Sequence, residues 1–202
     1  MKTAPMIVTS EGIGIKEALA LTEKLGKENG LSPKSVLHLR LLGEELFGML
    51  RGIAGEIKAD YWIDHADKSF ELHMKSDVQM TPERKEQFLA AASDGANEAT
   101  KSFMGKVRVM IANFLASTKE ALPYAMINTA AAAPAGSGFD GISAGGWSMI
   151  SYREELQKHL SEDQKAADAW DELERSIVAN IADDVKVRIV GKTVEITLFK
   201  TF

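Results

Sequence analysis

Cysteine is absent from all 202 residues of the chain. The absence excludes disulfide bonds, thiolate metal ligands and thiol nucleophiles. The four histidines are scattered at His38, His65, His73 and His159. His65 and His73 are expected to approach each other across a hairpin, but no third ligand has the spacing of a metal site. We therefore expect no metal ion.

Long hydrophobic runs are missing as well. The richest apolar stretch, 107–115, contains Arg108 and Asn113 and is far shorter than the roughly 18 apolar residues of a membrane span. Residues 1–10 carry one lysine and an apolar run interrupted by Pro5, without the pattern of a signal peptide. The sequence therefore predicts a cytoplasmic protein with no membrane partner.

An excess of positive charge is also lacking. The chain has 24 lysines and arginines against 29 aspartates and glutamates, a formal net charge of −5. Proteins that bind phosphate backbones need clustered basic residues, so we expect no nucleic-acid partner. Hydrophobic residues make up 45% of the chain, enough to bury a core, and we expect a single domain over residues 1–202.

Two amphipathic helices are expected in the first quarter of the chain. The first covers residues 13–28 and stops at Asn29-Gly30. The second begins at Ser32-Pro33, where serine can cap free N–H groups and proline suits the first turn. It runs to about residue 53, and its apolar residues recur at spacings of three and four, which is typical of a helix that packs on a core.

Alternation of apolar and polar residues predicts the strands. A short strand is expected at residues 4–9. Residues 57–63 and 70–76 alternate on either side of the polar turn 64–68 and predict a hairpin. Residues 185–189 and 194–198 do the same around Gly191-Lys192, which predicts a second hairpin at the end of the chain.

The segment between the hairpins is of a different composition. A helical stretch is expected from Thr81-Pro82 towards residue 117, and residues 122–146 are rich in alanine, glycine, serine and proline. Capping boxes at Ser151 and Ser161 predict helices at 151–159 and 162–181. The whole order predicts an α/β (α+β) two-layer sandwich, in which a mixed sheet has helices on one face and residues 119–181 form an inserted loop and helices.

The stretch 31–49, LSPKSVLHLRLLGEELFGM, resembles the paired-acid helix of the GHKL ATPases, the Bergerat-fold family of histidine kinases and anti-sigma factors. The strand that ends at Asp77 and the closing strand 191–199 are also similar to this family. The resemblance covers about residues 1–80 and 182–202. It implies an ATPase-like fold in which a helix carboxylate acts on a nucleophile, an asparagine binds Mg²⁺ and a strand-end aspartate binds adenine.

Carried over residue by residue, the resemblance makes Glu45 the candidate catalytic carboxylate and Asp77 the candidate adenine ligand. Gly105 is the candidate member of a phosphate-binding loop. The sequence departs from the family at the remaining motif positions: the asparagine position falls on Met49, or on Gly48 if Glu44 is the carboxylate, and Gln79 and Thr81 replace the adenine-site glycines. Methionine sulfur cannot replace the oxygen ligands that Mg²⁺ requires.

Two further features lie in the expected insertion. Gly136, Gly138 and Gly141 match G-x-G-x-x-G as a string, but an Ala/Pro stretch precedes them instead of a strand, so a flexible loop is the better interpretation. Trp147 and Tyr152 follow this loop and either anchor it or contact a partner.

These observations favour a non-catalytic regulatory or protein-interaction domain on a degenerate GHKL-like scaffold, which binds another protein or forms a homodimer and needs no cofactor. The first alternative is an ATP-binding, anti-sigma-factor-like kinase or ATPase, with Mg²⁺ as cofactor. The second is a small-molecule sensor that uses the former nucleotide pocket, made more apolar by Met49 and Met80.

Overall fold

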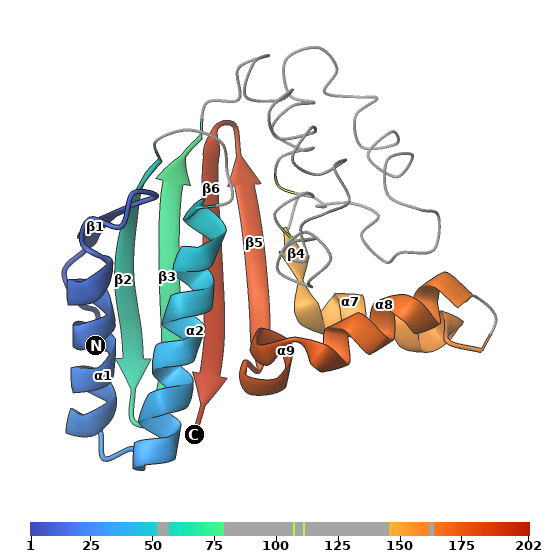
Figure 1. Cartoon of the computed structure of the whole chain (residues 1–202), viewed down its shortest axis with the longest axis horizontal. Helices are drawn as coiled ribbons and strands as arrows, with labels where there is room; N and C mark the ends of the chain where they lie inside the picture. The colour runs from blue at the N-terminus through green and yellow to red at the C-terminus, as the bar shows by residue number, and fades with distance from the viewer. Residues whose placement is uncertain (52–56, 79–106, 108–110, 112–145, 162–163) are drawn as a thin grey trace.

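The computed structural model describes residues 1–51, 57–78, 107, 111, 146–161 and 164–202, and it has an α+β fold (Figure 1). The strands form one six-stranded sheet in the order β1-β2-β3-β6-β5-β4. The strands are β1 (Met6–Thr9), β2 (Lys58–Ala66), β3 (Ser69–Asp77), β4 (Trp147–Ser148), β5 (Asp184–Val190) and β6 (Thr193–Thr201). The helices of the described part are α1 (Ile15–Glu28), α2 (Pro33–Arg51), α7 (Met149–His159), α8 (Gln164–Arg175) and α9 (Ile177–Ile181).

Every pairing in this sheet is antiparallel, so the prediction of a mixed sheet is wrong. The two hairpins, β2–β3 and β5–β6, are antiparallel because short turns join them. The β1–β2 pair is antiparallel because two helices that run in opposite directions, α1 and α2, connect the strands. After the two helices, the chain is again at the end of the sheet where β1 stops. β2 therefore starts beside the end of β1 and runs in the opposite direction.

Local sequence explains where α1 and α2 begin and end. Gly30 adopts a positive φ of 70° after α1, and the Asn29 side chain donates a hydrogen bond of 2.8 Å to the Leu25 carbonyl oxygen. The Ser32 hydroxyl oxygen accepts a hydrogen bond of 3.1 Å from the Ser35 backbone N–H at the start of α2. The sequence predicted this turn and this cap at the same residues.

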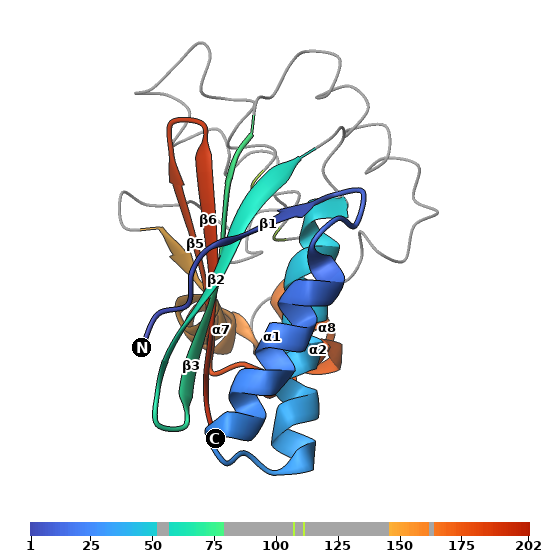
Figure 2. The ribbon, with the colours of Figure 1, turned by 90° about the vertical axis from the view of Figure 1, so that its left-hand side faces the viewer.

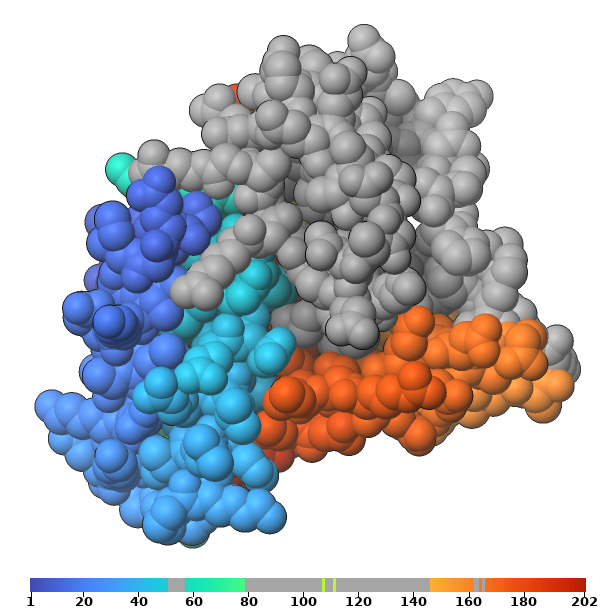
Figure 3. Space-filling view, in the orientation of Figure 1, coloured from blue at the N-terminus to red at the C-terminus, as the bar shows by residue number. Residues whose placement is uncertain are grey.

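The two helices cover one face of the sheet (Figures 1 and 2). The buried residues of α2 recur at helical spacing and pack on the apolar positions of β2, β3 and β6; they include Leu39, Leu42, Leu46, Met49 and Leu50. The Phe47 and Tyr61 rings meet edge to face with centroids 4.8 Å apart. On the surface seen in Figure 3, α1 and α2 lie side by side, and α9 contacts α2.

The described part of the expected insertion belongs partly to the sheet, because β4 pairs with β5. The helix expected at 162–181 is interrupted at Ser176, whose side chain caps α9 by accepting a hydrogen bond of 3.3 Å from the Ala179 N–H. Residues 119–145, with the G-x-G-x-x-G string, lie outside the described residues, as does all of the helical stretch expected at 81–117 apart from residues 107 and 111.

Candidate functional site

The candidate site lies on the face of the sheet opposite α1 and α2, which we call the open face. It is defined by the residues of β2, β3, β6 and β5 that alternate with those facing α1 and α2. On β3 the buried residues are Phe70, Leu72, Met74 and Ser76, so the residues between them point to the open face. In the antiparallel register, each of these residues has a direct neighbour on the next strand. The open face therefore consists of rows of residues that cross the strands, with one residue from each strand.

One row consists of four charged residues of alternating sign. In register across β2, β3, β6 and β5 the row is Asp60, Lys75, Glu195 and Arg188. Opposite charges in directly opposed positions attract each other. In the part of the chain that the structure describes, however, none of the four makes an ion pair of 4 Å or less with a lysine, arginine, aspartate or glutamate. Among the described residues, the ion-pair contact made by this row is that of Glu195, whose carboxylate oxygen lies 3.7 Å from the His73 Nδ1.

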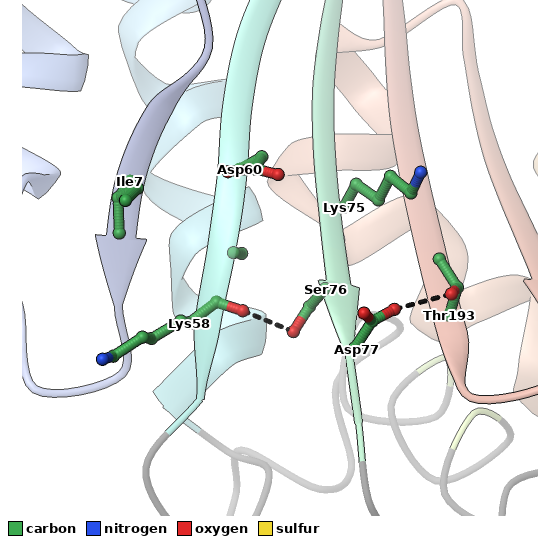
Figure 4. Close-up of a pocket in the computed structure, with 8 residues that line it drawn as sticks. Ile7, Lys58, Asp60, Lys75, Ser76, Asp77 and Thr193 are labelled. Carbon is green, nitrogen blue, oxygen red and sulfur yellow. Dashed lines mark hydrogen bonds between the residues drawn. The ribbon is translucent and has the colours of Figure 1, made fainter.

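A groove of about 630 Å³ runs over one end of the open face (Figure 4). Its lining residues come from β1, β2, β3 and β6 and are Ile7, Lys58, Ala59, Asp60, Lys75, Ser76, Asp77 and Thr193. Two hydrogen bonds hold its floor: Thr193 donates to the Asp77 carboxylate at 2.6 Å, and Ser76 donates to the Lys58 carbonyl oxygen at 2.7 Å. Ile7 is 63% exposed and forms an apolar wall beside the charged residues.

An aromatic cluster occupies the next row of the open face. The His73 and Trp62 rings stack with centroids 4.8 Å apart and planes inclined by 5°, and the Lys2 amino group lies 4.6 Å from the Trp62 ring centroid. The Trp62 indole N–H donates to the Asp64 carboxylate at 3.2 Å. The His73 Nδ1 lies 3.1 Å from the Thr197 hydroxyl oxygen. The stacked rings and hydrogen bonds fix the centre of the open face.

Three carboxylates surround the His73 ring. The nearest oxygens of Asp64 and Glu71 lie 3.4 Å from Nε2, and an oxygen of Glu195 lies 3.7 Å from Nδ1. A protonated imidazole would be attracted to all three carboxylates. Among the described residues, no group of three or more histidine, aspartate or glutamate side chains has an arrangement that could hold a metal ion.

The structure does not bring Glu45 and Asp77 together. Glu45 lies on α2, where burial raises the pKa of its carboxyl group and the charge of Glu44 raises it further. Asp77 lies on the opposite face of the sheet, in the floor of the groove. Residue 105 is outside the described residues. Met49, at the asparagine position of the GHKL motif, is buried in the core with 2% exposure.

Trp147 and Tyr152 are both buried, with exposures of 6% and 2%. Their ring centroids lie 5.9 Å apart, and both residues belong to the hydrophobic core. Of the two roles considered for them, this position fits anchoring of β4 and α7 and gives no exposed contact surface. His65 and His73 do not pair across the hairpin, because the register places His65 opposite Phe70 and His73 opposite Trp62.

The charged row and the aromatic cluster were missed in the sequence. Alternation along each strand identifies their positions as polar and outward-facing, which is the one available signal. It does not reveal that β3 pairs with β6, so the neighbourhood of Lys75 and Glu195 cannot be read from it.

Comparisons of the chain with protein-family models, with curated proteins and with solved structures give no match. Among the described helices, none combines the length and the apolar character that crossing a membrane requires.

Proposed function

We propose that this chain is a non-catalytic regulatory domain that binds a protein partner with the open face of its sheet. The observation that carries the proposal is the charged row, in which four side chains of alternating sign stand side by side and, among the described residues, none forms an ion pair with a lysine, arginine, aspartate or glutamate. Charges arranged in this way make protein association more specific and faster when a partner presents the complementary pattern.

The separation of Glu45 from Asp77 supports a role without catalysis. In the GHKL-like reading, one carboxylate activates a nucleophile while the other holds the base of the same nucleotide, so both must face one pocket. Here α2 carries Glu45 on one side of the sheet, and the Asp77 side chain lies in the groove on the other. A scaffold of this kind would keep the family's helix pair and hairpins and use a different surface.

Site-specific cross-linking tests the proposal cleanly because the chain has no cysteine. A photo-activatable maleimide attached to Lys58→Cys, at the rim of the groove and outside the charged row, should give adducts in extracts of the source cells. The matched control is Lys34→Cys, an exposed lysine at the start of α2. The proposal requires adducts at position 58 that are absent at position 34; equal labelling at the two positions, or none at position 58, would refute it.

A second candidate function rests on Glu45. Its carboxyl pKa is raised by burial and by Glu44, as expected for a general base tuned towards neutral pH. The alternative is therefore an ATP-binding kinase or ATPase of the GHKL type, with Mg²⁺ as cofactor and the nucleotide on the α2 side of the sheet. ATP with Mg²⁺ at about 100 times its Kd should then stabilise the fold by roughly 2.7 kcal/mol. An unchanged melting temperature in millimolar ATP and Mg²⁺ would reject this alternative.

A further inference from the structure

We propose that the open face binds the open face of a second copy of this chain, around a two-fold axis parallel to the strands. This inference rests on the proposed function, since it takes the open face as the interaction surface and names the partner. It is carried by the order of the charges across the sheet and by the size of the face.

The charged row is complementary to itself under this rotation. Read across β2, β3, β6 and β5, the signs are negative, positive, negative and positive at Asp60, Lys75, Glu195 and Arg188. A two-fold axis between β3 and β6 reverses the order in the second copy. Each negative position then meets a positive one, so that Asp60 faces Arg188 of the second copy and Lys75 faces Glu195 of the second copy.

Each of these contacts occurs twice because the interface is isologous. The rotation keeps equivalent rows opposite each other, since the axis runs along the strands. Among the described residues, none of the four charges is paired with a lysine, arginine, aspartate or glutamate, and Glu195 lies 3.7 Å from the His73 Nδ1. No lysine–carboxylate or arginine–carboxylate pair of the described part therefore has to be broken when the two faces meet. A row of like charges, or a row whose signs are the same at equal distances on either side of its centre, would repel its own copy in this arrangement.

The size of the face is sufficient for a specific but weak dimer. Four strands of up to nine residues span roughly 19 Å by 30 Å, or about 600 Å² for each copy. The total of about 1,200 Å² lies at the lower limit of specific protein interfaces. Twisted sheets stack face to face with their strands within about 30° of each other, which keeps the rows in contact near the axis. The Trp62 and His73 rings are stacked beside the charged row, with centroids 4.8 Å apart.

Charge-reversal variants provide the test, with sedimentation of the full chain in low salt as the measurement. Lys75→Glu and Glu195→Lys each place like charges opposite one another twice, so each variant alone should dimerise at least about tenfold more weakly than the wild type. An equimolar mixture of the two variants should dimerise again, because Glu at position 75 of one copy then faces Lys at position 195 of the other. The double variant should also dimerise as a single species.

The mixing step separates association from folding. Lys75 and Glu195 are direct cross-strand neighbours within one chain, so each single variant also introduces a repulsion in its own sheet. Mixing cannot repair that internal repulsion, but it can repair a contact between copies. Lys34→Glu is the control for the change in net charge, because Lys34 lies at the start of α2, and it should leave the dimer unchanged.

The wild-type chain should be a dimer at about 100 µM whose Kd rises with salt, because screening weakens contacts between exposed charges. A monomeric wild-type chain under these conditions overturns the inference, and so does a mixture that stays monomeric while each variant keeps its circular dichroism spectrum. Cross-linking of Lys58→Cys to a different protein, together with a monomeric wild type, would overturn self-association and leave the proposed interaction domain standing.

Discussion

Removing the hydroxyl group of Tyr61 should destabilise the fold less than removing that of Thr22, although the two groups share one hydrogen bond. Both side chains are fully buried, and their oxygens lie 2.8 Å apart. The Thr22 hydroxyl also lies 2.8 Å from the Ala18 carbonyl oxygen, which can only accept. A hydroxyl group has one hydrogen, so Thr22 donates to Ala18 and Tyr61 donates to Thr22.

The loss in free energy of unfolding for each variant depends on whether it leaves a buried hydroxyl group without a hydrogen-bond partner. Tyr61→Phe removes one hydrogen bond while Thr22 keeps its bond to Ala18, so the free energy of unfolding should fall by about 1 kcal/mol. Thr22→Val removes the acceptor and leaves the Tyr61 hydroxyl buried and unsatisfied, which should cost about 2 kcal/mol. The double variant should cost no more than about 1 kcal/mol, because no unsatisfied group remains.

Urea unfolding followed by circular dichroism measures all three free energies, and thermal melts should show shifts of about 2–4 °C per kcal/mol for a chain of this size. A larger loss for Tyr61→Phe than for Thr22→Val would refute the assignment of the donor. Burial also raises the pKa of Tyr61 in the folded state. The neutral Tyr61 hydroxyl contributes fully to the free energy of unfolding below the pKa of an unfolded tyrosine, about 10, and this stability is lost as the pH rises above that value. Tyr61→Phe has no group to titrate there and should lose less stability at alkaline pH than the wild type.

Three further predictions concern stability and can be measured by urea unfolding. Gly14→Ala should cost more than about 2 kcal/mol, because φ is +75° and the new Cβ would lie 2.1 Å from the Ile7 carbonyl oxygen, whereas Gly30→Ala, with a similar φ and open space, should cost about 1 kcal/mol. Ser148→Ala should cost about 1 kcal/mol, because the Ser148 hydroxyl oxygen caps the first turn of α7. Glu45→Gln should stabilise the fold at pH 7 and lose this advantage near pH 4, because the raised carboxyl pKa costs stability as the pH rises through it. Equal costs at the two glycines, an unchanged Ser148→Ala, or a Glu45→Gln effect that does not vary with pH would contradict the respective arguments.

The sequence predicted the elements that depend on neighbouring residues. Alternation and turn residues predicted the β2–β3 hairpin, which turns between Ala66 and Ser69, and the β5–β6 hairpin, which turns at Gly191. Ser32 and Pro33 predicted the start of α2. The break at Ser176 could not be seen in the same way. The apolar spacing of the expected 162–181 helix continues through it, while the structure leaves Ile177 48% exposed and starts a new helix there.

In the candidate site as well, some features follow from the local sequence and others from the pairing of distant strands. Alternation on β3 places Asp77 on the face opposite Ser76, whereas the resemblance to the GHKL motif predicted Asp77 only as an adenine ligand. The row that places Lys75 beside Glu195 depends on the pairing of β3 with β6, which joins residues more than 100 positions apart.

The sequence by itself therefore determined α1, α2, the two hairpins and the outward-facing positions of their strands, because residues a few positions apart fix these through backbone geometry and side-chain periodicity. Only the tertiary structure decided the order of the strands, the antiparallel pairing of β1 with β2 and of β3 with β6, the side of the sheet on which α2 and Glu45 lie, and the alternation of charge across the open face. These depend on how distant segments bury their apolar sides in one shared core, and no local pattern contains that information.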